Sequence, residues 1–188
     1  MIDDVIDRIR NEMIDTFNDL FIWFDVCDEL KSYRKDPNSW SISEILEHIS
    51  LTNSYLLILI RKGVAKSLER SSKSDYKIAL DTYDLDWEKM KQIGEHGAFV
   101  WNRPAHMEPK GELGLSEVYT VLHAQLEECM NCLKQLDDGQ GVLYTTMMSV
   151  NNCGKIDVYH YIYFVCQHAR RHLKQMEIIK KRFEESKN

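Results

Sequence analysis

Residues that interrupt helices are scarce in this sequence, which has three prolines and eight glycines among 188 residues. Most of them fall between long helical patterns, where they mark irregular connections. The glycine motifs of common enzyme classes are missing too, since there is no Walker loop, no Gly-x-Gly-x-x-Gly and no Gly-x-Ser-x-Gly. The sequence therefore gives no support to nucleotide binding or to serine hydrolase chemistry.

Long apolar runs are also absent, and no stretch is long enough to cross a bilayer. The acidic start Met1–Asp4 lacks the basic and then apolar layout of a signal peptide. The five cysteines are an odd number without the spacing of a disulfide framework, which agrees with a reducing compartment. We therefore expect a cytoplasmic protein with no membrane partner.

Positive charge is in the minority, with 24 Lys and Arg against 30 Asp and Glu and a net charge of −6. The basic runs Arg170–Arg171 and Lys180–Arg182 lie in helical contexts with acidic residues nearby. Nucleic-acid binding would need a basic stripe, and the sequence has none. We therefore expect no nucleic-acid partner.

Helical periodicity is what the sequence has in abundance. Ser41 and Glu44 form a capping box that starts one helix. Residues 63–113 form a long connection with a short helix at 86–93, and this connection can return along a whole helix length. We predict an all-α four-helix bundle in a single domain over residues 1–188, with residues 137–156 irregular. Its helices would cover about residues 2–30, 41–63, 115–136 and 157–185.

Two histidines on the last predicted helix, His168 and His172, are four residues apart and therefore share one helical face. At about 100° per residue, both project onto the middle of the apolar stripe of that helix. This spacing suits two ligands of one divalent metal ion. Spacing alone leaves a second interpretation open, because two buried histidines can each bond to a separate neighbour.

His48 is the natural third ligand, since it flanks the inner face of the second helix. Three imidazoles would leave a coordination position open, as catalytic metal sites do. The alternative is a histidine at the boundary of the core, and His123 on the third helix is the next candidate ligand. Glu47 projects about 100° further from the core than His48. Because there is no His-Glu-x-x-His motif, the pattern argues against peptidase chemistry.

The connection contains a segment, residues 99–109, that is dense in aromatic and cationic side chains for a loop. Such a loop could close over a pocket and hold an anionic substrate through Arg103, with Trp101 and His106 as further pocket residues. The alternative is that Trp101 plugs the open end of the bundle and Arg103 points into solvent.

The segments Trp40–Ile49 (WSISEILEHI) and Gln167–Gln175 (QHARRHLKQ) together resemble the DinB/YfiT-like superfamily, and the stretch from Trp101 to Met107 is similar to that of some members. The resemblance implies an up-down-down-up four-helix bundle, often a homodimer. It also implies one divalent metal ion, zinc or nickel, held by His48, His168 and His172. Some members are S-transferases that use low-molecular-weight thiols such as bacillithiol.

Our leading hypothesis is a metal-dependent thiol S-transferase whose partners are a small-molecule thiol and an electrophile. Gln175, one turn beyond His172, would hydrogen-bond that ligand and orient it. The competing hypothesis is a non-catalytic metal-binding protein induced by stress or DNA damage. A fourth protein ligand such as His123 would favour this second hypothesis, whereas an open position facing a cavity would favour catalysis. A third alternative is that the three histidines bind no metal in this protein.

Overall fold

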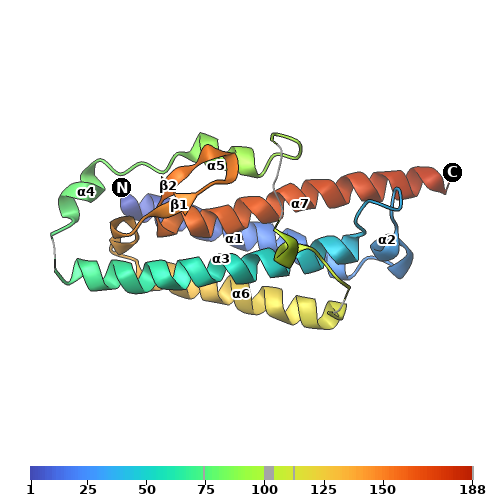
Figure 1. Cartoon of the computed structure of the whole chain (residues 1–188), viewed down its shortest axis with the longest axis horizontal. Coiled ribbons are helices and arrows are strands. Elements are labelled where there is room, and N and C mark those ends of the chain that lie inside the picture. Colours follow the sequence, from blue (N-terminus) through green and yellow to red (C-terminus); the bar gives the residue numbers. More distant parts are fainter. Residues whose placement is uncertain (74, 100–103, 112, 188) are drawn as a thin grey trace.

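The computed structural model describes residues 1–73, 75–99, 104–111 and 113–187. Long helices dominate it and pack side by side (Figure 1), which confirms the predicted all-α bundle. The four long helices are α1 (Ile2–Phe21), α3 (Ile42–Ser71), α6 (Leu115–Gln135) and α7 (Val158–Ser186). Helices α1 and α6 begin close to the predicted positions.

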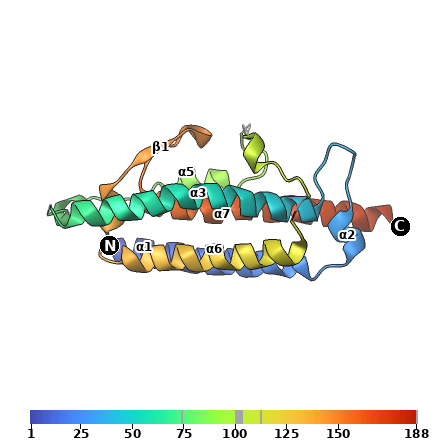
Figure 2. The same cartoon turned by 60° about the horizontal axis from the view of Figure 1, so that its bottom comes forward.

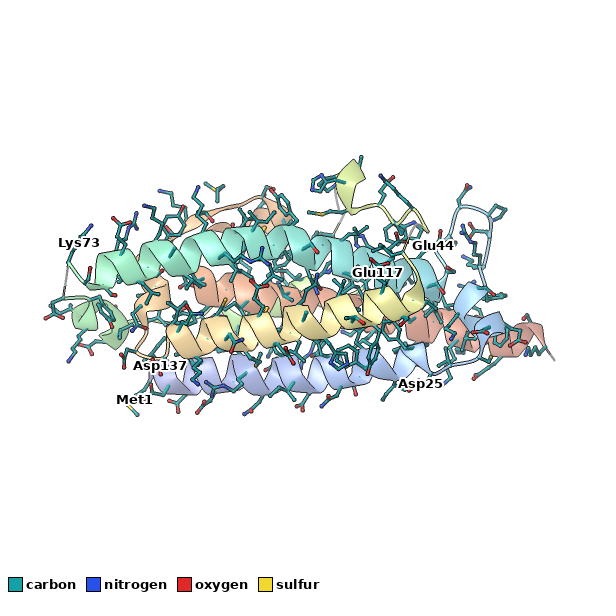
Figure 3. The ribbon with its side chains drawn as sticks, turned by 90° about the horizontal axis from the view of Figure 1, so that it is seen from below. Met1, Asp25, Glu44, Lys73, Glu117 and Asp137 are labelled. Atoms are coloured by element: carbon teal, nitrogen blue, oxygen red, sulfur yellow. The ribbon has the colours of Figure 1, made fainter. Side chains whose placement is uncertain are left out.

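The helices run up, down, down and up. Figure 3 shows α1 leading from the end of the bundle at Met1 to the end at Asp25, while α3 returns from Glu44 toward Lys73. Helix α6 runs in the same direction as α3, and α7 runs back alongside α1. Each of α1 and α3 packs on both α6 and α7. The core therefore lies between four mutually supporting helices.

The first predicted helix is shorter than its apolar pattern. Helix α1 ends at Phe21, a 3₁₀ turn covers Ile22–Phe24, and a separate helix α2 covers Asp28–Ser32. The chain changes direction at Cys27, whose backbone is extended, yet Trp23 and Leu30 are buried in the same core. Burial therefore continues across a break in the helix, which the helical period alone does not reveal.

Helix α3 begins as predicted and ends later than predicted. The Glu44 carboxylate accepts a hydrogen bond from the Ser41 backbone N–H at 2.9 Å, and the Ser41 hydroxyl accepts one from Glu44 N–H at 3.3 Å. The helix continues past Gly63 because that glycine is a contact point and not a terminus. A Cβ atom at Gly63 would lie 2.7 Å from Val158 Cγ2 on α7.

The connection between α3 and α6 crosses the surface of the bundle and carries short elements. They are α4 (Lys77–Asp81), α5 (Trp87–Ile93) and the 3₁₀ turn η2 (Ala105–Met107). Helix α5 packs on α7, and η2 packs on α3. The predicted helix at 86–93 is therefore present, with Asp86 as its cap.

A small β-hairpin occupies part of the region predicted to be irregular. Strands β1 (Thr146–Met148) and β2 (Gly154–Ile156) pair antiparallel, between the 3₁₀ turn η3 (Gln140–Leu143) and α7, with the turn η4 (Val150–Asn152) at the tip. Three-residue strands are too short to show a two-residue period, so the pattern gave no signal. Figure 2 shows the hairpin and η2 rising from the same side of the bundle above α3. Among the described residues, no helix is long and apolar enough to cross a membrane.

Candidate metal centre

The structure brings His48 on α3 together with His168 and His172 on α7. All three are buried, and one nitrogen from each lies within 4.8 Å of the others. The imidazole ring centres are 4.5 Å apart for His168 and His172, and 4.9 and 5.2 Å from His48 to His172 and His168. Three potential ligands from two helices thus meet in the interior of the bundle.

The local geometry follows from the helix period. One turn separates His168 from His172, and their Nε2 atoms are 3.1 Å apart. Two nitrogen ligands at about 2.0–2.1 Å from one ion are separated by roughly 2.9–3.4 Å at ordinary coordination angles. The spacing of the two Nε2 atoms therefore fits two ligands of a single divalent ion.

Hydrogen bonds indicate which nitrogen carries the hydrogen in two of the rings. The Met107 backbone carbonyl accepts from His48 Nδ1 at 2.6 Å, and the Gln175 amide oxygen accepts from His172 Nδ1 at 3.0 Å. Since these oxygens can only accept, Nδ1 carries the hydrogen in both rings and Nε2 keeps its lone pair. Gln175 thus lies where the sequence places it, beside the outer nitrogen of His172.

The rings of α7 are held in the neutral form. Burial lowers the pKa of His168 well below its usual range, and the neighbouring His172, His48 and Arg171 lower it further. Burial also lowers the pKa of His172, with additional effects of His48 and Arg171. Neutral imidazole is the form that binds a metal, so these two ligands need no deprotonation at pH 7.

Among the described residues, no fourth His, Cys, Asp or Glu joins the three histidines. His123, the alternative ligand considered from the sequence, lies on α6 and stacks on Phe21, with ring centres 3.7 Å apart. It faces α1 because Phe21 and Tyr119 form an aromatic surface on that side. The protein ligands thus leave room in a coordination shell of four.

A pocket of about 640 Å³ is lined by all three histidines. This volume is typical of small-molecule sites. Its walls combine apolar and aromatic side chains with polar ones such as Asn38, Thr52 and Gln175, and with the cationic Arg171. The walls come from the loop before α3 (Trp40), from α3 (Tyr55, Leu56, Leu59), from the connection (His96, Phe99, Met107), from the hairpin region (Met147, Met148, Val150) and from α7 (Tyr161, Phe164, Arg171).

The predicted pocket residues have different outcomes. Trp101 and Arg103 lie outside the described residues. His106 is exposed in η2, and its ring centre is 5.2 Å from that of Tyr55, which lines the pocket. His106 is not itself among the described lining residues.

Sequence reasoning missed two features of the site. The hairpin contributes Met147 and Met148 to the pocket, although no strand was predicted there. Glu47 was expected to point away from the core, but only 4% of it is exposed. The connection covers it, because its carboxylate accepts hydrogen bonds from the backbone N–H groups of Lys110 and Gly111. A helical projection of α3 contains no information about that covering segment.

These observations define the class of protein: a helical bundle whose interior holds three histidines that could bind a metal ion. The DinB superfamily profile matches residues 6–176, and the chain belongs to this family. The match covers α3 and α6 in full, α1 from Ile6 onward, α7 up to Met176, and all three histidines. No curated protein and no solved structure matches the chain significantly.

Proposed function

We propose that this protein is a metal-dependent enzyme of the thiol S-transferase type. The observation that carries the proposal is the set of three buried imidazoles that line a pocket without a fourth ligand among the described residues. Structural zinc sites have four protein ligands, whereas catalytic sites have three and an open position. The donor set therefore supports catalysis over a purely structural role for the ion.

His48, His168 and His172 would hold the ion, which we propose to be zinc or nickel. When bound, such an ion lowers the pKa of a thiol or water at its open position, which supplies a nucleophile at neutral pH. The two ligands on α7 are already neutral, and hydrogen bonds already orient His48 and His172. Preorganised ligands of this kind lose little conformational freedom when the ion binds.

The pocket supports a reaction between two small molecules. Apolar side chains such as Leu56, Phe164 and Met148 would hold the body of an electrophile and keep water away from it. Arg171 places a positive charge beside the histidines, and its guanidinium is fixed by a hydrogen bond to the Glu95 carbonyl at 2.8 Å. This charge favours a thiol that reacts in its anionic form.

In the proposed reaction, the sulfur of a low-molecular-weight thiol forms a bond to the electrophilic carbon. The bond from that carbon to its leaving group breaks, and the leaving group departs with the electron pair. The proton of the thiol is released to water. Because the thiol loses its proton before attack, the chain needs no separate strong base.

Elemental analysis followed by a turnover screen tests this proposal. The purified protein is reconstituted with Zn²⁺ or Ni²⁺, and thiol consumption is followed with several low-molecular-weight thiols and a generic alkylating electrophile. We expect about one ion per chain and turnover that disappears on chelation. A protein that binds the ion but consumes no thiol would overturn the transferase assignment. In that case, the non-catalytic metal-binding role becomes the better interpretation.

A further inference from the structure

Two consecutive residues of α3 hold the same short piece of the connection. His48 donates from Nδ1 to the Met107 carbonyl at 2.6 Å. Glu47 accepts from the N–H groups of Lys110 and Gly111 at 3.2 and 2.8 Å, one on each carboxylate oxygen. One neighbour thus binds the segment as a donor and the other binds it as an acceptor.

The carboxylate of Glu47 lies in an unusual environment, because it is buried. Glutamate is rarely buried, because moving its charge out of water is unfavourable unless hydrogen bonds replace hydration. Here, two backbone N–H groups from residues 110 and 111 replace it, and the side chain is 4% exposed. The buried carboxylate therefore ties residues 110–111 to α3, next to the point where Met107 contacts His48.

We propose that Glu47 is a positioning residue of the metal centre. By holding residues 110–111 it keeps the Met107 carbonyl in place, and that carbonyl keeps the hydrogen of His48 on Nδ1. His48 Nε2 then retains its lone pair toward His168 and His172. The effect on metal affinity rests on the proposed function, whereas the effect on the His48 ring does not.

Gly111 provides a second, independent way to disturb the same segment. Its backbone has φ +68°, in the left-handed region that residues with a side chain rarely adopt. A Cβ atom there would meet nothing within 4 Å, so a substitution acts through the backbone alone. Gly154 has φ +74° and equally open space, and it belongs to β2, a different segment from residues 107–111.

The experiment compares Glu47→Ala, Glu47→Gln and Gly111→Ala in the full-length chain. One measurement is the Kd for Zn²⁺, obtained by competition with a chromophoric chelator. The other is the ¹⁵N chemical shift of the His48 ring nitrogens in the metal-free protein, which reports the tautomer. Glu128→Gln, which removes a partly exposed carboxylate paired with Arg61, and Gly154→Ala are the matched controls.

We expect Glu47→Ala to raise the Kd about tenfold, as loss of support for a ligand does in other metal sites. The Nε2–H tautomer of His48 becomes populated at the same time. The Kd of Glu47→Gln should lie between those of Glu47→Ala and the unmodified protein, because the amide oxygen of the introduced glutamine can still accept a hydrogen bond from one of the two N–H groups. Gly111→Ala should act in the same direction even if Glu47→Ala fails to fold, and both controls should match the unmodified protein.

A Kd and a His48 spectrum that are unchanged in Glu47→Ala and Gly111→Ala would overturn the inference. If the unmodified protein binds no Zn²⁺, the proposed function fails. In that case, the tautomer of His48 in the variants still decides whether Glu47 positions the ring.

Discussion

His168 and His172 face each other one turn apart on α7, with their Nε2 atoms 3.1 Å apart inside the bundle. Two neutral imidazoles at this distance can share one hydrogen bond, and a metal ion would engage both lone pairs. Burial keeps the pKa of both rings well below the usual range, so a proton cannot easily take the place of the ion.

Replacement of one of these rings should abolish tight metal binding. His168→Ala removes one of three ligands, and we expect metal content to fall from about one ion per chain to a small fraction after dialysis. His123→Ala is the matched control, because it removes an imidazole that stacks on Phe21 outside the group of three. Metal content measured by elemental analysis checks this prediction. Equal content in His168→Ala and the unmodified protein would contradict the site.

Loss of the hydrogen bond to His172 should weaken the site without removing a ligand. Gln175→Leu deletes the oxygen that accepts from His172 Nδ1 at 3.0 Å, and we expect the Kd for Zn²⁺ to rise about tenfold. Gln175→Glu retains an acceptor at this position and should bind at least as tightly as the unmodified protein. Competition titrations of the two variants measure the difference. Tight binding by Gln175→Leu would show that His172 needs no such partner.

The pH dependence of stability should reflect Glu12, which joins α1 to α7. Burial raises the pKa of this carboxyl, but hydrogen bonds from Arg8 and Tyr163 and the charge of Arg170 outweigh it, so the pKa is lowered. A lowered pKa means that Glu12 stabilises the fold above about pH 4.5 and loses this effect as pH falls through its folded pKa. Glu12→Gln should therefore cost about 1–2 kcal/mol at pH 7 and much less near pH 3.

Urea unfolding at several pH values measures this difference. Glu69→Gln is the control, since the pKa of Glu69 is also lowered, to about 2, by Lys66 and Lys73, but these groups are exposed. Water and salt screen such pairs, so the control should change stability far less than Glu12→Gln. A difference between Glu12→Gln and the unmodified protein that stays constant from pH 7 to pH 3 would contradict the assignment.

Both the family and the helical bundle were predictable from the sequence. Several segments that contact the site, such as the β-hairpin, were not. The predicted homodimer and the proposed metal, thiol and electrophile stay predictions, because neither the structure nor the comparisons test them. The pocket role of His106 also stays a prediction. Its ring lies in an exposed turn beside Tyr55, which lines the pocket.

The proximity of His168 and His172 is determined by the sequence, because 3.6 residues per turn place positions four apart on one face whatever surrounds the helix. The sequence also determines the start of α3 after Ser41, because the capping hydrogen bonds join residues only three positions apart. The contact of His48 with the pair depends on how α3 packs against α7. The bonds from Glu47 and His48 to residues 107–111 depend on the path of a connection about sixty residues further along the chain. Only the tertiary structure decides such contacts, because the residue pattern within one helix carries no information about the path of a distant connection.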